Sequence, residues 1–536
     1  MTRPANFRGV WRYDLIARAL YSEAAGIGRA MPDAVAVPSD ADDVAELVRW
    51  AAAAQHPLVP RGSGSSMAGG AIGPGVIVDL SRMAHINEVD AARRLVQVGP
   101  GALRGAVNEQ AKRAGLRFPV DPSSGAFCTV GGMAATNAAG AHTMHFGSTR
   151  RWVTALDCVF ADGSHAWVRR GEPAPRKIGA VTRFLNDVAP DIRTAASRLA
   201  HRTLRKDSSG YALAAFAESG ELVDLLVGSE GTLAMFVGVE LSLAPMPNAT
   251  CSLLAAFASL DRAVDGAAAA RVAGSAACEL LDKTFLDVAA SASPIPVPAG
   301  TEAVLLIELE AASDTDAATA AASLERALKL AGATTTLVAL DAAREAELWT
   351  LRHAASPILA RLDPSLKSMQ FIEDGCVPPE RLADYVRGVR AVLAARGVRG
   401  VIFGHAGDAN VHVNPLVDVR RPEWRAEVAA ILTDVTALVA ALGGSSSGEH
   451  GDGRLRTPLS VKTWPVLDRD LFARVKRAFD PAGILNPGVK VPLPDQRSLG
   501  EIKYDPTLTP LPPEARAAMD AIDGERAWSR YRLSAL

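Results

Sequence analysis

Two blocks rich in glycine and serine place the strongest constraint on how this chain can fold. The first, RGSGSSMAGG at residues 61–70, lies between the short apolar runs HPLVP and GVIVDL, and the second spans residues 121–150. Short apolar runs bounded by turn residues are typical of buried strands, and residues 38–55, with Ser39 as the N-cap, have the periodicity of a helix. Strands that alternate with helices predict an α/β arrangement for the first third of the chain.

The pattern changes after the run LAPMP, near residues 245–250. Strand-like runs such as AVLLIELEA and GVIFGHAG are separated there by helices of ordinary length, which predicts an α+β domain built on an antiparallel sheet. The fold class of the whole chain is therefore expected to be α+β, with a loosely packed tail that contains LTPLPPEAR. The expected divisions are an N-terminal segment (1–30), the glycine-rich domain (31–246), the second domain (247–465), a returning segment (466–495) and the tail (496–536).

The composition argues against several classes of function. The 57 basic and 59 acidic residues give a formal net charge of −2, and no basic run is interleaved with aromatic residues, so no nucleic-acid partner is expected. No segment reaches about 18 uninterrupted apolar residues, and the N-terminus lacks the apolar core of a signal peptide, so we expect no membrane span and a cytoplasmic protein. The five cysteines are scattered without a C-x-x-C, which argues against an iron–sulfur cluster or disulfides within this chain.

The stretch GHAGDANVHVNP has the pattern of a β-hairpin with a glycine-containing turn. His405 and His412 then lie across the turn from each other, with Cβ atoms roughly 4.5–5.5 Å apart, and could share a metal ion. Asn414 falls on the same face as His412. The loop GSSSGEHGDG supplies Glu449 and His450, and carboxylate and imidazole groups suit a divalent ion such as zinc or manganese. A structural hairpin and a solvated flexible loop are the alternatives at this point.

Glycine-rich loops after strands let backbone N–H groups approach a phosphate, and two such loops suit a pyrophosphate, although each alone is equally compatible with a tight turn. The chain has neither a G-x-G-x-x-G motif at the start of a helix nor a P-loop, so any dinucleotide binds in another way.

Four segments of the chain resemble the FAD-binding domain of the vanillyl-alcohol oxidase superfamily. They are PLVPRGSGSSMAGGAIGPGVIVDLSRM, DPSSGAFCTVGGMAATNAAG, FGSTR and VGSEGTLA. GHAGDANVH, SGEHGDG and FDPAGILNPG narrow this resemblance to the FAD-linked D-2-hydroxyacid dehydrogenases, which act on substrates such as D-lactate, glycolate and D-2-hydroxyglutarate.

The resemblance implies a two-subdomain FAD-binding domain followed by an α+β substrate, or cap, domain with an antiparallel sheet. Relatives with covalent flavin often carry a histidine near the position of Ser65, and none is present here, so the FAD is expected to be held non-covalently. The family's cofactor contacts fall on Arg61, Gly62, Ser63, Gly64, Ser65, Pro122, Ser123, Thr129, Gly131, Gly132, Asn137, Gly140, Glu230, Gly231 and Asn486.

The resemblance also implies the chemistry. His405, His412 and Glu449 match the ligands of a divalent metal beside the flavin, and His450 matches the catalytic base. In the D-2-hydroxyglutarate branch an arginine, a hydroxyl residue and a lysine bind substrate carboxylates. These roles fall on Arg352, Ser356 and Lys367, with Asn414 assisting; serine stands here where threonine is common. The expected reaction is oxidation of a D-2-hydroxy acid to the 2-oxo acid.

Three other functions stay open on the sequence: a flavin-dependent ether-lipid synthase-like transferase on the same fold, a metal-dependent hydrolase without flavin, and a non-catalytic binding subunit.

The tail 501–536 resembles the stretch that precedes the iron–sulfur half of long fused relatives. Because this chain carries no cluster motif, we expect electrons to pass to a separate iron–sulfur protein or a soluble carrier, or this chain to be part of a longer product, with the tail exposed as a docking or linking segment. A homodimer is compatible with the sequence.

Overall fold

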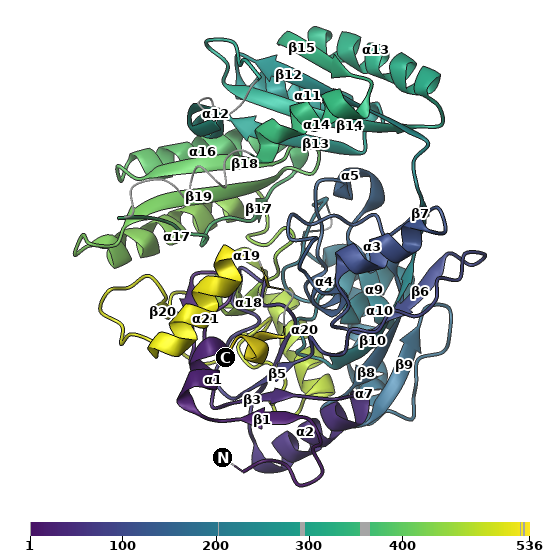
Figure 1. Cartoon of the computed structure of the whole chain (residues 1–536), viewed down its shortest axis with the longest axis vertical. Helices are drawn as coiled ribbons and strands as arrows, with labels where there is room; N and C mark the ends of the chain where they lie inside the picture. Colours follow the sequence, from purple (N-terminus) through teal and green to yellow (C-terminus); the bar gives the residue numbers. More distant parts are fainter. Residues whose placement is uncertain (1, 202, 290–294, 354–364, 526, 529–530) are drawn as a thin grey trace.

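The computed structural model describes residues 2–201, 203–289, 295–353, 365–525, 527–528 and 531–536. Figure 1 shows two lobes: the first half of the chain and its C-terminal part form one, and the strands and helices between β12 and α17 form the other. Within the described ranges, no helix is both long and apolar enough to cross a membrane.

The first lobe contains a mixed four-stranded sheet in the order β1-β3-β5-β4. Its strands are β1 (Val10–Arg12), β3 (Ala34–Val37), β5 (Val76–Asp79) and β4 (Leu58–Arg61). β3 and β4 run parallel to β5, whereas β1 pairs antiparallel with β3. All four residues of β3 are buried, because α2 (Ala41–Ala54) covers one face of the sheet and α1 (Leu15–Leu20) the other. The N-cap of α2 is Asp40, whose side chain accepts from the N–H of Asp43, so the predicted cap at Ser39 is wrong by one residue.

A second, antiparallel sheet in the same lobe has the order β6-β10-β8-β9. Its strands are β6 (Leu95–Val98), β10 (Met235–Ser242), β8 (Val153–Val159) and β9 (His165–Arg169). Its hydrophobic cluster includes residues of several helices. These are α3 (Arg104–Lys112), α4 (Val130–Thr136), α7 (Gly179–Asp187), α8 (Ala189–Ala195), α9 (Leu213–Ser219), α10 (Leu222–Leu226) and α20 (Val466–Phe479).

The second lobe is built on an eight-stranded antiparallel sheet with the order β15-β12-β14-β13-β18-β19-β16, in which β17 also pairs with β19. The strands are β12 (Ala249–Phe257), β13 (Ala277–Asp282), β14 (Ala303–Ala311), β15 (Ala333–Ala339), β16 (Leu366–Ser368), β17 (Gly375–Cys376), β18 (Arg399–His405) and β19 (Asn410–Asp418). Residues of four helices pack on one face: α11 (Leu260–Val272), α13 (Asp314–Leu330), α16 (Leu382–Ala394) and α17 (Trp424–Ala441). α12 (Lys283–Ala289) and α14 (Ala342–His353) pack on the other. The expected antiparallel sheet is therefore confirmed.

The C-terminal segment returns to the first lobe and packs tightly there, as Figure 1 shows in yellow beside α1. β20 (Glu501–Ile502) pairs with β2 (Gly28–Arg29), and α21 (Pro513–Gly524) shares a buried cluster with α1. Buried apolar side chains of this segment are Leu511, Ala515, Ala518, Met519, Ile522 and Leu533. The expectation of a loosely packed, exposed tail is wrong, because apolar residues at helical spacing lie among its prolines and charges.

Candidate functional site

The loop after β4 leaves a row of backbone donors without partners. The N–H groups of residues 62–66 donate no hydrogen bond to any described residue. Gly64 has φ +80°, and a Cβ on Gly62 would lie 2.2 Å from Thr129 Oγ1, so glycine is required for both the turn and the packing. Arg61 lies beneath the loop and donates to the carbonyl oxygens of Tyr21 (3.2 Å) and Glu23 (2.9 Å). A row of unpaired N–H groups of this kind suits an anion such as a diphosphate.

These donors line a cavity of ≈ 530 Å³. The buried hydroxyl of Ser66, also on its wall, has no hydrogen-bond partner among the described residues. Of the residues that match the family's cofactor contacts, those on the wall are Arg61, Gly62, Ser63, Gly64, Ser65, Pro122, Ser123, Thr129, Gly131, Gly132, Glu230 and Gly231. The structure thus brings the two glycine-rich blocks and the GSEGT segment around one cavity, and the unpaired donors fit the diphosphate of a dinucleotide.

The other three matched residues lie behind the wall. Asn486 donates from Nδ2 to the carbonyls of Gly70 (3.0 Å) and Glu230 (2.8 Å), so it ties two cavity loops together. Asn137 is the left-handed C-cap of α4, and its side chain accepts from the N–H of Arg150. The carbonyl of Gly140 accepts from Lys206 Nζ at 3.0 Å. These residues shape the cavity without lining it.

A cluster of histidine and carboxylate groups adjoins the cavity where Glu449 and His450 line it. His405 Nε2, His412 Nε2 and Glu449 Oε1 form a triangle in which each pair of atoms is 3.2 Å apart. Tetrahedral donors about 2.0–2.1 Å from a zinc ion are separated by roughly 3.3 Å. The triangle therefore has the dimensions of a metal-binding face.

The second nitrogen of each ring shows that both Nε2 atoms carry a lone pair in the neutral imidazole. His412 Nδ1 donates to the Glu373 carbonyl at 2.8 Å, because a carbonyl can only accept. His405 Nδ1 bonds the carboxylate of Glu279, its cross-strand neighbour on β13. Donation from the far nitrogen to a carbonyl or carboxylate is the usual support for a metal-bound histidine. When both rings are neutral, three electron-pair donors therefore converge without a proton between them.

The strand register explains why the two histidines meet. His405 pairs directly with Asn410 and His412 with Phe403, so the histidines are diagonal neighbours on one face of the hairpin. Their ring centroids are 5.1 Å apart. The predicted proximity is confirmed, but the predicted direct cross-strand pairing is wrong. The predicted shared face of His412 and Asn414 follows from the same strand, β19.

Charges around the triangle shift its pKa values. Burial opposes protonation of His405, but the Glu279 carboxylate outweighs burial and raises the pKa of His405 to about 9. Burial dominates at His412 and lowers its pKa. Burial also opposes ionisation of Glu449, yet Lys206 and His405 hold the pKa of Glu449 well below its usual range. The Glu449 carboxylate is therefore ionised at neutral pH.

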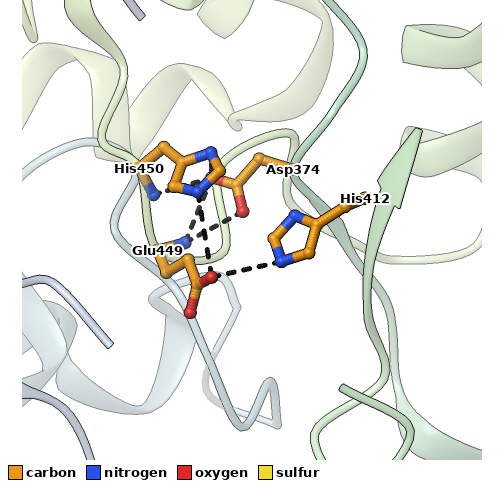
Figure 2. Close-up of side chains that lie close together, drawn as sticks. All are labelled: Asp374, His412, Glu449 and His450. Atoms are coloured by element: carbon orange, nitrogen blue, oxygen red, sulfur yellow. Dashed lines mark hydrogen bonds and ion pairs between the residues drawn. The ribbon is translucent and has the colours of Figure 1, made fainter. Parts of the chain in front are cut away.

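The loop that carries Glu449 and His450 is held rigidly in place. The Asp374 carboxylate accepts from the N–H groups of Glu449 (3.1 Å) and His450 (2.8 Å), as Figure 2 shows. Further along, Glu230 Oε1 accepts from the N–H of Asp452 at 2.7 Å. A Cβ on Gly448 would lie 2.4 Å from Asn410 Nδ2. The alternative of a solvated flexible loop is thus excluded.

His450 lies beside the triangle and lines the cavity together with Glu449. Its ring stacks on His412, with centroids 5.3 Å apart, and its Nε2 lies 3.8 Å from Glu449 Oε1. Its Nδ1 lies 3.3 Å from Glu373 Oε1. Burial opposes protonation here, but Asp374 and Glu373 together raise the pKa of His450. The arrangement is that of a base whose far nitrogen is oriented by a carboxylate.

Comparison with known proteins identifies the family. Residues 32–169 match the FAD binding domain, and residues 246–489 match the C-terminal domain of FAD linked oxidases. Glycolate oxidase subunit GlcD of Bacillus subtilis is 30% identical over 465 residues, covering 86% of this chain and 89% of that protein. This chain belongs to the FAD-linked oxidase family. The chain is accordingly an FAD-linked oxidoreductase, and the cavity with unpaired backbone donors is the candidate site for its FAD.

Other relatives of this FAD-linked oxidase carry related names. D-lactate dehydrogenase of Archaeoglobus fulgidus is 30% identical over 458 residues, covering 85% of this chain and 90% of that protein. D-2-hydroxyglutarate dehydrogenase of Pseudomonas putida is 30% identical over 560 residues, covering 99% of this chain and 54% of that protein. This chain therefore spans about half the length of the Pseudomonas relative.

Solved structures confirm the predicted fold type. 4-Ethylphenol oxidase from Gulosibacter chungangensis superposes with a TM-score of 0.67 at 16% identity, covering 90% of this chain and 94% of that one. Alkyldihydroxyacetonephosphate synthase superposes with a TM-score of 0.61 at 16% identity, covering 89% and 83%. At this identity the likeness shows the fold alone. The FAD-linked oxidase has the vanillyl-alcohol oxidase type of α+β fold.

The four residues expected to bind substrate do not form a compact cluster like that of His405, His412 and Glu449. Arg352, near the end of α14, donates from Nε to Glu279 at 2.7 Å, so it reaches the triangle only through the carboxylate that also holds His405. Ser356 lies outside the described residues. Lys367 and Asn414 are half-buried on β16 and β19 of the same sheet, and neither lines the FAD cavity.

The sequence reading missed several charged groups of the site. Lys206, from the FAD-binding lobe, donates to Glu449 Oε2 at 2.7 Å and so joins the two lobes at the cluster. It lies in RTLRKDSSGY, a segment with no recognisable pattern. Glu373 and Asp374 lie in FIEDG, where the adjacent carboxylates before a glycine are a usable sequence signal. Glu279 gives no signal of its own, because it lies inside the apolar strand β13. Arg456 belongs to the site because it forms an ion pair with Glu373.

Proposed function

We propose that this FAD-linked oxidase oxidises a D-2-hydroxy acid of the D-2-hydroxyglutarate or D-lactate type to the 2-oxo acid, with a divalent metal bound by His405, His412 and Glu449. The observation that carries the proposal is the triangle of two imidazole nitrogens and one carboxylate oxygen, 3.2 Å on each side, beside the FAD cavity. The names of the relatives support the substrate class, because glycolate, D-lactate and D-2-hydroxyglutarate are all 2-hydroxy acids.

Two bound groups supply the chemistry that side chains lack. Bound FAD would supply the hydride acceptor, and a zinc- or manganese-type ion held by His405, His412 and Glu449 would supply Lewis-acid polarisation of the substrate's oxygens. The ligands must be unprotonated to bind the ion. The raised pKa of His405 means that metal binding releases a proton at neutral pH.

His450 removes the hydroxyl proton in this proposal. Its Nδ1 hydrogen bonds the ionised Glu373, which leaves the lone pair on Nε2, the nitrogen nearer to the triangle. The carboxylates that raise its pKa also make it a stronger base. Stacking on His412 fixes the ring plane, so proton acceptance needs no reorganisation of the side chain.

Binding of the substrate carboxylates is assigned to Arg352, Ser356, Lys367 and Asn414. A guanidinium suits a carboxylate because it can donate two parallel hydrogen bonds. Arg352 uses Nε on Glu279, and its position over the ring of Phe403, at 4.5 Å from the centroid, restrains its orientation. In this assignment Glu279 positions both Arg352 and His405.

We further propose that a separate iron–sulfur protein or soluble carrier accepts the electrons. The glycolate oxidase relative is named as a subunit, and the Pseudomonas relative is about twice as long as the part it shares with this chain. The transferase alternative is not favoured, because the likeness to alkyldihydroxyacetonephosphate synthase reaches only 16% identity and extends to the fold alone.

A dye-linked screen tests the proposed reaction. The metal-loaded protein is assayed anaerobically with an artificial electron acceptor against D- and L-lactate, glycolate and D- and L-2-hydroxyglutarate. We expect turnover with a D-2-hydroxy acid and little with its L-enantiomer. A protein that retains FAD and metal but reduces the dye with none of these acids would refute the substrate class.

A further inference from the structure

The C-terminal segment contributes side chains to the wall of the FAD cavity. Lys503, Tyr504, Asp523 and Trp528 line the same ≈ 530 Å³ space as the loop of residues 61–66. They lie beyond both regions that match the family, which end at residues 169 and 489. The fold positions them, because β20 pairs with β2 and α21 packs on α1. This part of the site is therefore not included in the family match.

Lys503 lies directly beside the loop that carries the unpaired N–H groups. Its Nζ donates to the carbonyls of Ala24 (3.1 Å) and Ala25 (3.4 Å). The N–H of Ala25 donates in turn to the Gly64 carbonyl at 3.0 Å, and the N–H of Gly26 to the Ser66 carbonyl at 3.3 Å. The segment that holds the ammonium group is thus hydrogen-bonded to the anion-binding loop.

Of the two long basic side chains on the cavity wall, Lys503 is the one placed to bind an anion in the cavity. The other long basic side chain on the wall, Arg61, directs its guanidinium to backbone carbonyls beneath the loop. A Cβ on Gly64 would lie only 2.4 Å from Arg61 Nη2, which shows that the guanidinium fills the space under the turn. In the described parts of the chain, no ion pair joins Lys503 to a carboxylate. Among the described residues, its ammonium group has carbonyl partners and no carboxylate at ion-pair distance, although Glu23 and Asp523 lie near enough to favour its charged form.

The surroundings of Lys503 favour a bound anion. Burial lowers the pKa of Lys503, and the nearby Arg516 and Arg532 act in the same direction, whereas Glu23 and Asp523 oppose them. A diphosphate on the adjacent N–H groups would supply the missing negative charge. Charge-assisted hydrogen bonds from an ammonium to a phosphate oxygen are among the strong ones in proteins.

We propose that Lys503 binds the diphosphate of FAD, and that the C-terminal segment is a wall of the FAD site rather than a docking tail. The backbone N–H groups of the loop hold the diphosphate from one side, and the ammonium group neutralises it from the other. FAD binding then depends on the packing of α21 on α1. The proposal concerns FAD alone and does not rest on the identity of the substrate or the metal.

Binding measurements on the apoprotein test the role of Lys503. Lys503→Gln removes the charge while its amide can still donate to the Ala24 and Ala25 carbonyls, and Lys503→Arg keeps the charge. Lys462→Met, an exposed lysine away from the cavity, is the matched control. FAD and ADP are titrated separately, because ADP carries the diphosphate without the flavin ring. Thermal unfolding of each apoprotein shows that the variant folds, and Lys503→Met is the second neutral variant should Lys503→Gln fail to fold.

We expect the neutral variants to weaken both FAD and ADP by about 10- to 100-fold. Lys503→Arg should retain most of the affinity, and Lys462→Met should leave it unchanged. Two results would overturn the proposal. One is a neutral variant that folds and binds FAD as tightly as the wild type. The other is a loss of affinity for FAD without a parallel loss for ADP, which would place Lys503 at the flavin ring. Because no substrate is used, either result is independent of the proposed oxidation.

Discussion

At the level of single side chains, Glu373 decides which nitrogen of His450 is free to accept a proton. Its carboxylate lies 3.3 Å from His450 Nδ1 and is itself paired with Arg456, which keeps it ionised. The pKa of Glu373 is correspondingly lowered, although burial opposes this. The proton of a neutral His450 is therefore held on Nδ1, facing away from Glu449.

Replacement of His450 should separate catalysis from FAD binding. For His450→Ala we expect reduction of the bound flavin by substrate to slow by about 10²–10⁴-fold, the usual contribution of a general base. FAD affinity should change little, because His450 is only one of many residues that line the cavity. Rapid mixing of substrate with the oxidised protein measures the rate. His450→Gln, which keeps much of the side-chain volume, should be equally slow, and a rate within a few-fold of wild type in either variant would show that the base lies elsewhere.

At the level of elements, a cluster of charged side chains links α5 (Thr143–Phe146) to β14 of the cap domain. This cluster, called the joint below, consists of His142, Asp121 and Glu308. His142, the residue before α5, lies 2.5 Å from Asp121 Oδ2 and 2.8 Å from Glu308 Oε1. Burial opposes protonation, but the two carboxylates raise the pKa of His142 well above its usual range. The joint is therefore cationic at its centre at neutral pH and links the two lobes electrostatically.

The joint should make stability depend on pH. An unfolded histidine has a pKa of about 6.5, so above that pH the folded protein binds more protons at His142 than the unfolded chain does. The stabilisation is fully present below about pH 6.5 and is lost as the pH rises through the raised pKa. Thermal unfolding across this range should show a falling Tm in the wild type and a flatter profile in His142→Gln. Parallel profiles for the two proteins would mean that the joint contributes nothing.

The C-terminal helix offers a second test at this scale. Ala515 on α21 is 0% exposed and packs in the cluster shared with α1, whereas Ala517 on the same helix is exposed. Ala515→Glu should lower the free energy of unfolding by about 3 kcal/mol or more, because it buries a charge without a partner. Ala517→Glu should change it by less than about 0.5 kcal/mol. Denaturant unfolding measures both, and equal effects would show that the helix is not packed as described.

At the level of the whole molecule, the parts of the site that can be predicted from the sequence are those whose residues lie close together along the chain. The glycine blocks, the two histidines and the Glu449–His450 pair could all be found because each lies within one short motif. Lys206, Glu279 and the cavity face of the C-terminal segment could not, because strand pairing and packing across the two lobes bring them to the site. The tail was misjudged because its prolines and charges obscured apolar residues such as Leu511 and Ile522, which are buried.

The two lobes each supply one part of the site for the proposed reaction. Most of the wall of the FAD cavity comes from the first lobe, whereas His405 and His412 stand on β18 and β19 of the second and Glu449 lies on the loop after α17. Lys206 crosses between them to Glu449, with its Nζ 2.7 Å from Oε2. The proposed reaction therefore requires a metal ion held by one lobe to act on a substrate beside the flavin of the other.

Anaerobic reduction of the bound FAD, followed with and without metal, tests this account most directly. The protein is stripped with a chelator, checked for loss of metal and retention of flavin, and mixed with a D-2-hydroxy acid that the metal-loaded protein oxidises. We predict that the flavin stays oxidised in the stripped protein, that zinc or manganese restores its reduction, and that His412→Ala cannot be restored. Reduction of the flavin at the full rate in verified metal-free protein would contradict the account.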